Sequence, residues 1–382
     1  MNILIFTYSV TRTAGGVFDA VRELFTNTAF KQEELKIISY QDEYCDEDLS
    51  AWNNLPIKLF TPGFMLYSAE AKKTLLSTKA DILHMEALWR CPHRWMVDWK
   101  KQNKNRPIVC SPHGMLDPYI IQSQGRIKRL ISDIFFQKGL EAVDCYHALC
   151  QKELEDIRAY GLKQPVAIIP NGINLPNKTN IYSRKDKKLH LLYLGRLHRK
   201  KGIDIMLKAL AEIKKDNLEV LNKWHIDLVG WDHENCKADL ENIVHNEQLQ
   251  DLVTFHGGLF GEEKLRMYAT SDAYILPSHG EGLPMTVLEA WSWRLPVIMT
   301  PYCNIPEGFQ AGAAIRIDDN ISSIKNGLIN LFTMSDKQRE EIGNKGFSLV
   351  SEKFTWNASA KKMIQLYTWL LGNSEKPDFV FI

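Results

Sequence analysis

Short apolar runs alternate with longer stretches of helical period along the whole chain. Compact apolar runs between polar residues predict buried strands, and apolar positions three and four residues apart predict amphipathic helices between them. In the first half, the predicted strands are Ile3–Thr7, Leu35–Ser39, Ile82–Met85, Ile108–Ser111, Cys145–Leu149 and Val166–Ile169. In the second half, they are Leu189–Leu194, His225–Gly230, Val253–His256, Ala273–Leu276 and Pro296–Met299.

Helical periodicity fills the spaces between these strands. The predicted helices are Val17–Thr26, Ile127–Ala142, Ile203–Lys214, Lys237–Asn246, Glu262–Thr270 and Pro284–Trp293. Strands separated by helices indicate parallel sheets with right-handed crossovers, so we expect an α/β fold.

One segment near the middle of the chain is poor in apolar residues. Pro170–Lys188 reads PNGINLPNKTNIYSRKDKK, and its Asn, Lys, Pro and Gly content predicts a linker. A chain of 382 residues is long enough for two domains, so we place their boundary after residue 170. Two doubly wound domains would leave a cleft between them, and ligands of such sheets bind beyond the carboxyl ends of the strands.

Composition narrows the class of protein. The 47 Lys and Arg nearly balance the 46 Asp and Glu, which argues against a dedicated nucleic-acid surface. The 7 cysteines include no Cys-x-x-Cys pair, so we expect reduced thiols in a cytosolic protein. The N-terminus, MNILIFTYS, enters a strand pattern at once, and no run approaches the ~20 apolar residues of a membrane-spanning helix. We therefore expect a cytoplasmic protein without a signal peptide.

A cationic cluster follows the predicted strand Leu189–Leu194. After Gly195 come Arg196, His198, Arg199, Lys200 and Lys201, and a helix opens shortly after Gly202. Cations between a strand and a helix N-terminus suit a phosphate ligand, because Arg donates two hydrogen bonds and the helix dipole favours negative charge. A solvated basic loop is the alternative, and the order of strand, glycine, cations and helix favours the phosphate site.

A glycine pair follows the first predicted strand. Gly15 and Gly16 stand between Ile3–Thr7 and a predicted amphipathic helix, where glycine lets backbone N–H groups approach a ligand. The surrounding sequence has neither the Gly-x-Gly-x-x-Gly pattern nor the Gly-Lys-Ser/Thr of a P-loop. An ordinary loop explains the pair equally well.

Two histidines end or follow predicted strands. His113, in SPHGMLDP, comes just after Ile108–Ser111 and is a candidate to hydrogen-bond a substrate or to act as a general acid. A structural histidine that caps a neighbouring loop is the alternative. For His84, in DILHMEALW, the structural interpretation is favoured.

Two glutamates frame the start of a predicted helix in SHGEGLPMTVLEA. Glu281 follows the strand Ala273–Leu276, and Glu289 lies further along the helix that contains Pro284 in its first turn. A carboxylate beside the free N–H groups of a helix start can bind sugar hydroxyls while those groups bind phosphate. A capping glutamate followed by a salt-bridged one is the alternative.

An acidic stretch, Asp46–Leu49 (DEDL), imitates the Asp-x-Asp signature of metal-dependent sugar transfer. It stands in the acidic segment YQDEYCDEDLS without the usual apolar strand before it. We interpret it as a solvated surface loop and expect no metal site there.

Taken together, these segments resemble the retaining glycosyltransferases of family four, which have the GT-B fold. The resemblance rests on YLGRLHRKKGIDIMLKAL, on PSHGEGLPMTVLEAWSWRLPVI with its Glu-x7-Glu spacing, and on VTFHGGL, IIPNGIN and FTWNASAKKMIQLY in the family's order. SPHGMLDP is similar to enzymes that build bacterial exopolysaccharide and lipid-linked repeat units. The resemblance implies an N-terminal acceptor domain (residues 1–170), a donor-binding domain (171–354) and a last helix (about 355–382) that returns to the first domain.

The resemblance also implies roles for individual residues. Arg196 and Lys201 would bind the donor diphosphate, and Glu289 the ribose hydroxyls. Glu281 would hold the donor sugar, as would the amides of Gly282, Leu283 and Pro284. The remaining expected contacts are His113 to the sugar, Gly15 and Gly16 near the phosphates, and Gly258 and Leu259 to the base.

Two positions depart from the family pattern. A glycine commonly precedes the PV strand, whereas this chain has Trp293 and Arg294 there, which is expected to alter the helix end. The second histidine of a His-x-His after the third strand is Glu86, so acceptor contacts at that position do not transfer.

The implied function is transfer of a hexose from a nucleotide diphosphate sugar, with UDP-glucose as the first expectation, without a metal or other cofactor. The acceptor would be a hydroxyl of a saccharide or lipid-linked saccharide in cell-surface polysaccharide synthesis. Leu88–Lys101 and Gly125–Leu140 mix basic with aromatic or apolar residues, as in peripheral membrane helices or ordinary core helices. Alternatives to transfer are a sugar-nucleotide epimerase or phosphorylase of the same fold, or a non-catalytic nucleotide-sugar-binding protein.

Overall fold

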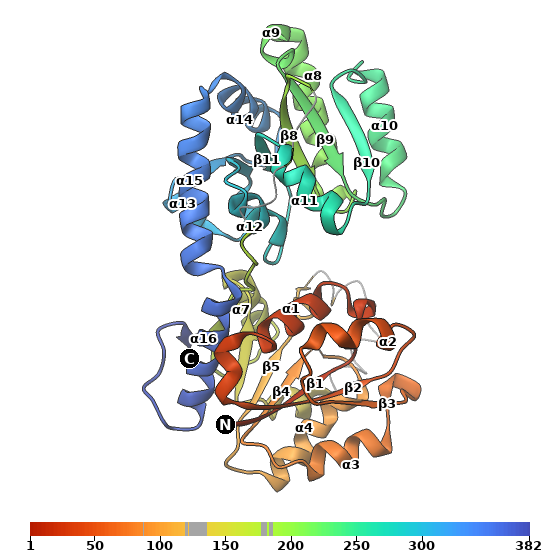
Figure 1. Cartoon of the computed structure of the whole chain (residues 1–382), viewed down its shortest axis with the longest axis vertical. Coiled ribbons are helices and arrows are strands. Elements are labelled where there is room, and N and C mark those ends of the chain that lie inside the picture. The colour runs from red at the N-terminus through yellow and green to blue at the C-terminus, as the bar shows by residue number, and fades with distance from the viewer. Residues whose placement is uncertain (87, 119–120, 122–135, 177–181, 183–185) are drawn as a thin grey trace. The chain divides into compact units, whose positions relative to one another are not determined.

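The computed structural model describes residues 1–86, 88–118, 121, 136–176, 182 and 186–382 (Figure 1). The chain forms two compact units, one of Met1–Gly172 with Trp356–Ile382 and the other of Ile173–Thr355. Most of the predicted helix Ile127–Ala142, most of the segment Gly125–Leu140 and part of the predicted linker lie outside the described residues.

Unit 1 is built on an eight-stranded sheet ordered β14-β7-β6-β5-β4-β1-β2-β3 (Figure 1). Neighbouring strands are parallel except β14 and β7, which are antiparallel. The strands are β1 (Asn2–Thr7), β2 (Glu34–Tyr40), β3 (Ile57–Phe60), β4 (Ile82–Glu86), β5 (Ile108–Ser111), β6 (Cys145–Ala148), β7 (Val166–Ile168) and β14 (Val380–Phe381). The α-helices described in this unit are α1 (Gly16–Phe25), α2 (Cys45–Asp48), α3 (Ala69–Ser77), α4 (Cys91–Gln102), α7 (Gln151–Ala159) and α16 (Trp356–Leu370).

The strands of unit 1 are covered on both faces. Ile3 and Ile5 of β1 pack with α1 and α16, whereas Leu4 and Phe6 pack with α3, α4 and α7. Successive side chains of a strand point to opposite faces, so a strand covered on both sides carries a continuous apolar run. Because α16 packs in the same core as α1, the expected return of the last helix to the first domain is confirmed.

Helix α4 covers most of the basic and aromatic segment Leu88–Lys101, for which the sequence allowed either a peripheral membrane helix or an ordinary core helix. Its Trp95, Met96 and Trp99 are buried in the core of unit 1. A helix that lies on a membrane needs its aromatic side chains on the outside, so these burials favour the core-helix alternative. No helix among the described residues is long and apolar enough to cross a membrane.

Unit 2 is built on a six-stranded parallel sheet ordered β10-β9-β8-β11-β12-β13. Its strands are β8 (Leu189–Leu194), β9 (Trp224–Val229), β10 (Val253–Gly257), β11 (Ala273–Leu276), β12 (Val297–Met299) and β13 (Ala314–Arg316). Its α-helices in the described residues are α8 (Ile203–Asp216), α9 (Leu218–Leu221), α10 (Cys236–Asn246), α11 (Gly261–Thr270), α12 (Met285–Ser292), α13 (Pro306–Gln310), α14 (Ile321–Thr333) and α15 (Asp336–Lys353). The predicted α/β class with parallel sheets is confirmed.

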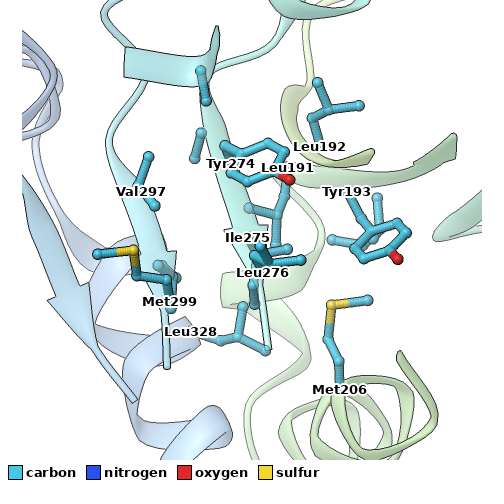
Figure 2. Close-up of a cluster of buried hydrophobic side chains, with 14 of the residues drawn as sticks. Leu191, Leu192, Tyr193, Met206, Tyr274, Ile275, Leu276, Val297, Met299 and Leu328 are labelled. Atoms are coloured by element: carbon cyan, nitrogen blue, oxygen red, sulfur yellow. The ribbon is translucent and has the colours of Figure 1, made fainter. Parts of the chain in front are cut away.

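The middle of the second sheet is the most deeply buried part of unit 2. Figure 2 shows Tyr193 of β8 and Tyr274 of β11 packed among the apolar side chains of the central strands, with Met206 of α8 and Leu328 of α14 beside them. The carboxyl ends of parallel strands meet at one edge of a sheet. The rigid centre therefore fixes the starting points of the loops that follow β8, β9, β10 and β11.

Candidate functional site

The loops after β8 and β11 are held together by backbone hydrogen bonds. The N–H of His279 donates to the carbonyl of Lys200 at 2.8 Å, and the hydroxyl of Ser278 donates to the same oxygen at 3.0 Å. The cationic cluster and the segment that contains Glu281 are therefore one local structure.

Lys201 and Glu281 form an ion pair across these two loops. Lys201 Nζ donates to Glu281 Oε1 at 2.7 Å and to Oε2 at 2.8 Å, and both side chains are largely buried. The backbone of Glu281 is also held, since its N–H donates to the carbonyl of Tyr302 at 2.9 Å and its carbonyl accepts from Asn304 Nδ2 at 2.6 Å. From the sequence, Lys201 was expected to bind the diphosphate and Glu281 the sugar, and the structure brings their charges into direct contact.

Arg196 lies beside this pair on the loop after β8. Its carbonyl accepts a hydrogen bond from the Tyr193 hydroxyl at 2.9 Å, which fixes the backbone, while its side chain is exposed. Among the described residues, no carboxylate forms an ion pair with its guanidinium. A guanidinium that is fixed at its base and open at its tip suits an anionic ligand.

Glu289 lies on α12 and is oriented by α11. Lys264 Nζ donates to Glu289 Oε1 at 2.6 Å, and the Tyr268 hydroxyl donates to Oε2 at 2.7 Å. Burial, strengthened by the charge of Glu289, raises the pKa of Tyr268 well above its usual range, so this hydroxyl remains a donor. The carboxylate is still 26% exposed, which leaves it accessible to a ligand hydroxyl.

The helix of Glu289 begins later than expected. Pro284 precedes α12 as its N-cap residue and does not lie in its first turn. Leu283 packs against the core of unit 2, while Gly282 is exposed. The exposed turn is thus the part of this segment that a ligand can reach.

Two exposed aromatic side chains at the same sheet edge were missed by sequence analysis. Trp231, after β9, and Phe260, after β10, stack with ring centroids 6.0 Å apart and an interplanar angle of 21°. They are 49% and 68% exposed. Gly258 lies against both, because a Cβ added there would be 3.5 Å from Phe260 and 3.6 Å from Trp231. Their positions in the loops that follow two predicted strands were the available signal.

A backbone contact joins the aromatic pair to the cationic loop. A Cβ on Gly230 would lie only 1.8 Å from the carbonyl oxygen of Gly195, so a side chain at Gly230 would force the loops after β8 and β9 apart. Trp231 directly follows Gly230, and Arg196 directly follows Gly195. The strand order therefore places the aromatic pair, the cations and Glu281 in succession along the sheet edge.

A group of possible metal ligands also lies near the cationic loop. Ligand atoms of His198, His233 and Glu234 come within 4.8 Å of one another. His198 Nδ1 accepts a hydrogen bond from the N–H of Lys200 at 3.1 Å, so its proton is on Nε2, which faces Glu234 at 3.2 Å. A protonated Nε2 cannot bind a metal, so this group fits a hydrogen-bonded cluster better than a metal site.

A cavity of about 580 Å3 adjoins the same loop. Its lining includes His198, Arg199, Lys200, Asp239 and His279. It does not include Arg196, Lys201 or Glu281, and it therefore lies beside the ion pair and not over it.

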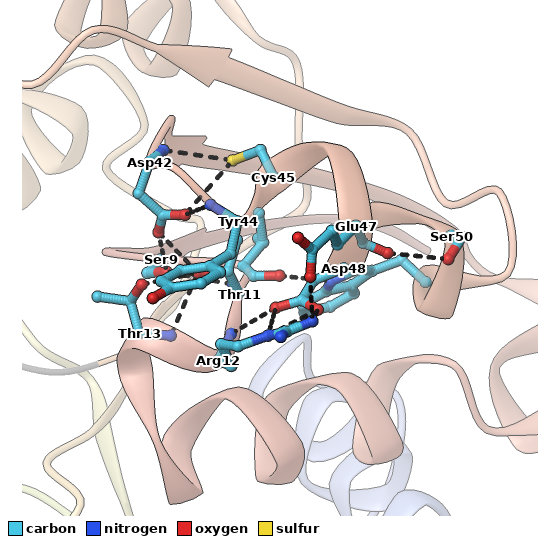
Figure 3. A network of polar contacts seen from close by, with 12 residues as sticks. Ser9, Thr11, Arg12, Thr13, Asp42, Tyr44, Cys45, Glu47, Asp48 and Ser50 are labelled. Atoms are coloured by element: carbon cyan, nitrogen blue, oxygen red, sulfur yellow. Dashed lines mark hydrogen bonds and ion pairs between the residues drawn. The ribbon is translucent and has the colours of Figure 1, made fainter.

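In unit 1, α1 begins at Gly16 after a loop that is hydrogen-bonded to Asp42 and Asp48 (Figure 3). A Cβ added at Gly15 or Gly16 would meet no atom within 4 Å, so this backbone is open to approach. Asp42 Oδ2 accepts from Thr11 Oγ1 at 2.7 Å and from Ser9 Oγ at 2.8 Å. Burial opposes the charge of Asp42, but these hydrogen bonds outweigh it and lower its pKa.

The acidic stretch DEDL is not the solvated loop that we expected. Asp48, at the end of α2, is buried and accepts from Arg12, with the guanidinium nitrogen 2.6 Å from Oδ1 and the backbone N–H 2.8 Å from Oδ2 (Figure 3). Asp46 and Glu47 are exposed, as predicted. The expectation failed for Asp48 because a partner 36 residues earlier in the chain neutralises its charge.

His113 lies beyond the end of β5 and contacts the last residue of β4. His113 Nε2 is 2.6 Å from Glu86 Oε2 and donates a hydrogen bond to it. His84 is fully buried and hydrogen-bonded to Tyr367 and Ser111, as its structural interpretation requires. Glu86 itself was seen in the sequence only as a departure from the family pattern.

Comparisons with known proteins agree with this geometry. Residues 176–348 match the family model described as glycosyl transferases group 1, and residues 38–176 match glycosyltransferase family 4. An uncharacterized glycosyltransferase of Methanocaldococcus jannaschii is 24% identical over 335 residues, which cover 80% of this chain and 79% of the relative. The D-inositol 3-phosphate glycosyltransferase of an Arthrobacter species is 20% identical over 53% of this chain and only 49% of its own length. The chain thus spans about half the length of some curated relatives that it matches.

Solved structures share the fold at low sequence identity. Sucrose-phosphate synthase from Thermosynechococcus elongatus has a TM-score of 0.70 at 20% identity, over 98% of this chain and 100% of that chain. HepE of Anabaena, solved in complex with UDP and glucose, has a TM-score of 0.70 at 16% identity, over 97% of this chain and 100% of that chain. These likenesses show the GT-B fold.

Proposed function

Because the chain belongs to glycosyltransferase family 4, whose members retain the anomeric configuration, we propose that it transfers a hexose from a nucleotide diphosphate sugar to a hydroxyl group. The observation that carries the proposal is the Lys201–Glu281 ion pair together with Arg196 of the same loop, whose exposed guanidinium forms no ion pair with a carboxylate of the described residues. A diphosphate leaving group needs fixed cations, and a sugar needs a carboxylate to bind its hydroxyls. Lys201 and Glu281 hold each other at one sheet edge, and the backbone of Arg196 is fixed in the same loop.

The order of groups along this edge supports a particular placement of the donor. The base lies at Gly258 and Leu259 against Trp231 and Phe260, the diphosphate at Arg196 and Lys201, and the sugar at Glu281 and the turn Gly282–Pro284. Glu289 binds the ribose hydroxyls with the carboxylate that Lys264 and Tyr268 orient. The succession from aromatic pair to cations to carboxylate follows the succession of base, diphosphate and sugar in a nucleotide sugar.

The proposed chemistry depends on the charges of Arg196, Lys201 and Glu281, which the fold positions before the substrate binds. The bond between the anomeric carbon and the diphosphate oxygen breaks, and the acceptor oxygen bonds to that carbon on the same face. Arg196 and Lys201 stabilise the negative charge on the leaving phosphate, which accepts the proton of the acceptor hydroxyl. Glu281 shares Lys201 with the phosphate and places its negative charge near the sugar, where positive charge develops at the anomeric carbon. Its role is positioning and charge stabilisation. His113 hydrogen-bonds the sugar, and Gly15 and Gly16 approach the phosphates. The donor proposed first is UDP-glucose, as the UDP and glucose complex of HepE supports.

The acceptor proposed is a hydroxyl of a saccharide or a lipid-linked saccharide in cell-surface polysaccharide synthesis. Peripheral contact with the inner face of the membrane would suit a lipid-linked acceptor. Since α4 buries its aromatic side chains, that contact would have to use another surface. Sedimentation with anionic liposomes tests it, because a protein that stays in the supernatant does not bind them.

Turnover of Arg196→Ala tests the function. We expect the rate of hexose transfer from UDP-glucose to fall by about 10² to 10³-fold, the usual effect of removing one donor to a developing oxyanion. Arg199→Ala is the matched control, because Arg199 is an exposed cation of the same loop without a proposed role, and its turnover should be unchanged. Equal rates for Arg196→Ala and the unmodified protein would remove Arg196 from the mechanism. If the unmodified protein converted the nucleotide sugar without an acceptor, that result would instead indicate an epimerase. If it formed no product from any donor, that result would indicate a binding protein.

A further inference from the structure

A buried polar cluster lies at the carboxyl ends of β4 and β5 in unit 1. Glu86, the last residue of β4, is 1% exposed. Its Oε2 is 2.6 Å from His113 Nε2, and its Oε1 is 3.3 Å from His84 Nε2. A buried carboxylate is costly unless an opposite charge or several hydrogen bonds compensate it. The question is which imidazole supplies that charge.

The protons of the other two histidines of the cluster can be assigned from their partners. His147 Nε2 is 2.8 Å from the carbonyl oxygen of Ile169, which only accepts, so Nε2 carries the proton and Nδ1 accepts from the Ser111 hydroxyl at 2.9 Å. Because the Ser111 hydroxyl uses its only hydrogen in the bond to His147, Ser111 Oγ accepts a hydrogen bond from His84 Nε2 at 2.7 Å. His84 Nδ1 then accepts from the hydroxyl of Tyr367.

This chain of donors and acceptors is complete with both imidazoles neutral. Burial lowers the pKa of His147 to about 4, and burial lowers the pKa of His84 although Glu86 opposes it. Burial opposes the charge of Glu86, but its imidazole neighbours outweigh burial and lower its pKa. With His84 and His147 neutral, the hydrogen bond and charge of His113 are what remain to keep Glu86 ionised. The compensating positive charge is therefore left to His113.

His113 is held from several elements in a strained conformation. Its backbone has a φ of 51°, which is uncommon for a residue with a side chain and is typical of strain retained at functional sites. The carboxylates that face it are Glu86 from β4 and Glu153 from α7, while His84 and His147 face the same cluster as neutral rings and Cys110 and Tyr367 as neutral acids. Burial alone would lower the pKa of His113, but the hydrogen bond and charge of Glu86 and the charge of Glu153 raise it.

We propose that Glu86 is a positioning residue that keeps His113 as an imidazolium, with Nε2 anchored on the buried carboxylate and Nδ1–H presented as a charged donor to an oxygen of the sugar. The inference rests on the proposed function. It also gives a physical reason for the carboxylate that replaces the second histidine of the family pattern. A charged donor in a buried site binds a hydroxyl or a developing oxyanion more strongly than a neutral one.

The first test measures His113 itself by NMR titration of its imidazole, assigned by the loss of its signal in His113→Gln. In the unmodified protein we expect His113 to titrate above the ordinary value of about 6.5. In Glu86→Gln we expect it to titrate below that value, since burial then outweighs the remaining charge of Glu153. Glu86→Asp keeps the charge and should keep the titration above the ordinary value. Glu155→Gln, an exposed carboxylate change on α7, should leave it unmoved. Titration of the unmodified protein at or below the ordinary value would overturn the proposal even if Glu86→Gln failed to fold.

The second test is the pH dependence of kcat/KM for hexose transfer. Activity that needs the imidazolium is present below the raised pKa of His113 and is lost as pH rises through it. In Glu86→Gln we expect this loss to begin at least about one pH unit lower, a tenfold deficit at pH 8 that shrinks as the pH falls. A merely structural role would lower activity equally at every pH, and that result would contradict the proposal. Absence of transfer by the unmodified protein would defeat the proposed function, while the NMR titration would still decide the state of His113.

Discussion

At the scale of single residues, one glycine determines how closely the two charged loops of unit 2 approach. Gly202 has a φ of 66°, and a Cβ there would lie 2.2 Å from the carbonyl oxygen of Pro277. Gly161 has a φ of 100° but would meet no atom within 4 Å. Both glycines have a positive φ, which disfavours a residue with a side chain. Only Gly202 also lacks space for a Cβ.

Alanine substitutions at these glycines should therefore have unequal costs. Gly161→Ala should lower the free energy of unfolding by about 1 to 2 kcal/mol, the strain of a left-handed residue. Gly202→Ala should cost more than that, because strain and a backbone clash add, and should also weaken UDP binding by separating Lys201 from Glu281. Urea unfolding midpoints and UDP titrations check both. If both substitutions lowered the free energy of unfolding equally, the loop that contains Pro277 would have to move away from the new Cβ without cost.

At the scale of elements, the end of α12 explains the Arg294 departure from the family pattern. Arg294 has a φ of 60° where helices often end in glycine, and the N–H of Leu295 donates back to the carbonyl of Ala290 at 3.0 Å. Its guanidinium lies 3.7 Å from the centroid of the Phe347 ring and donates to Asn344 Oδ1 at 2.5 Å. Contacts with α15 thus compensate the strain that glycine would avoid.

Close packing between α12 and α15 leads to a second prediction. A Cβ on Gly346 would lie 2.2 Å from Cδ1 of the buried Trp291. Gly346→Ala should lower the free energy of unfolding by about 1 to 3 kcal/mol, since overpacking outweighs the helix propensity of alanine. The exposed Ser348→Ala on the same helix should raise it by a few tenths of a kcal/mol, so equal gains at both positions would refute the packing argument. Chemical denaturation measures both, and UDP affinity shows whether a displaced α12 also displaces Glu289.

At the scale of the whole molecule, the cysteines report on the integrity of both units. All seven cysteines are thiols outside any disulfide, and all are buried except Cys91, which is half-buried. Burial raises the pKa of Cys145 and of Cys303 to about 12 and thereby removes the reactive thiolate as well as access.

Thiol titration at pH 8 should accordingly show one fast group in the native protein and all seven after unfolding. Cys91→Ser should remove the fast phase and leave the slow ones. Two or more fast thiols in the unmodified protein would mean that one unit opens locally without global unfolding.

The local pattern of the sequence was sufficient for most strands of the two sheets, whereas the roles of the candidate donor residues also needed the family resemblance. The strands of both sheets that carry site residues were predicted within a few residues, because strands covered on both faces are continuously apolar. Short edge strands such as β3, β13 and β14 were not predicted, since brief, partly exposed segments carry little pattern. Arg196, Lys201, Glu281 and Glu289 were named as candidates from the order of strand, loop and helix, and their donor roles came from the resemblance to family four and stay predictions.

What only the tertiary structure decided are the partners of these side chains. Three contacts of these side chains join residues that are distant in the chain. Lys201 pairs with Glu281, α11 orients Glu289, and Asp48 is buried against Arg12. The charge proposed for His113 depends on a chain of hydrogen bonds from β4, β5, β6 and α16. Periodicity and residue type record which face of an element is buried and what chemistry a side chain offers. They do not record which distant group neutralises a charge, because that is set by the folding of the chain in three dimensions.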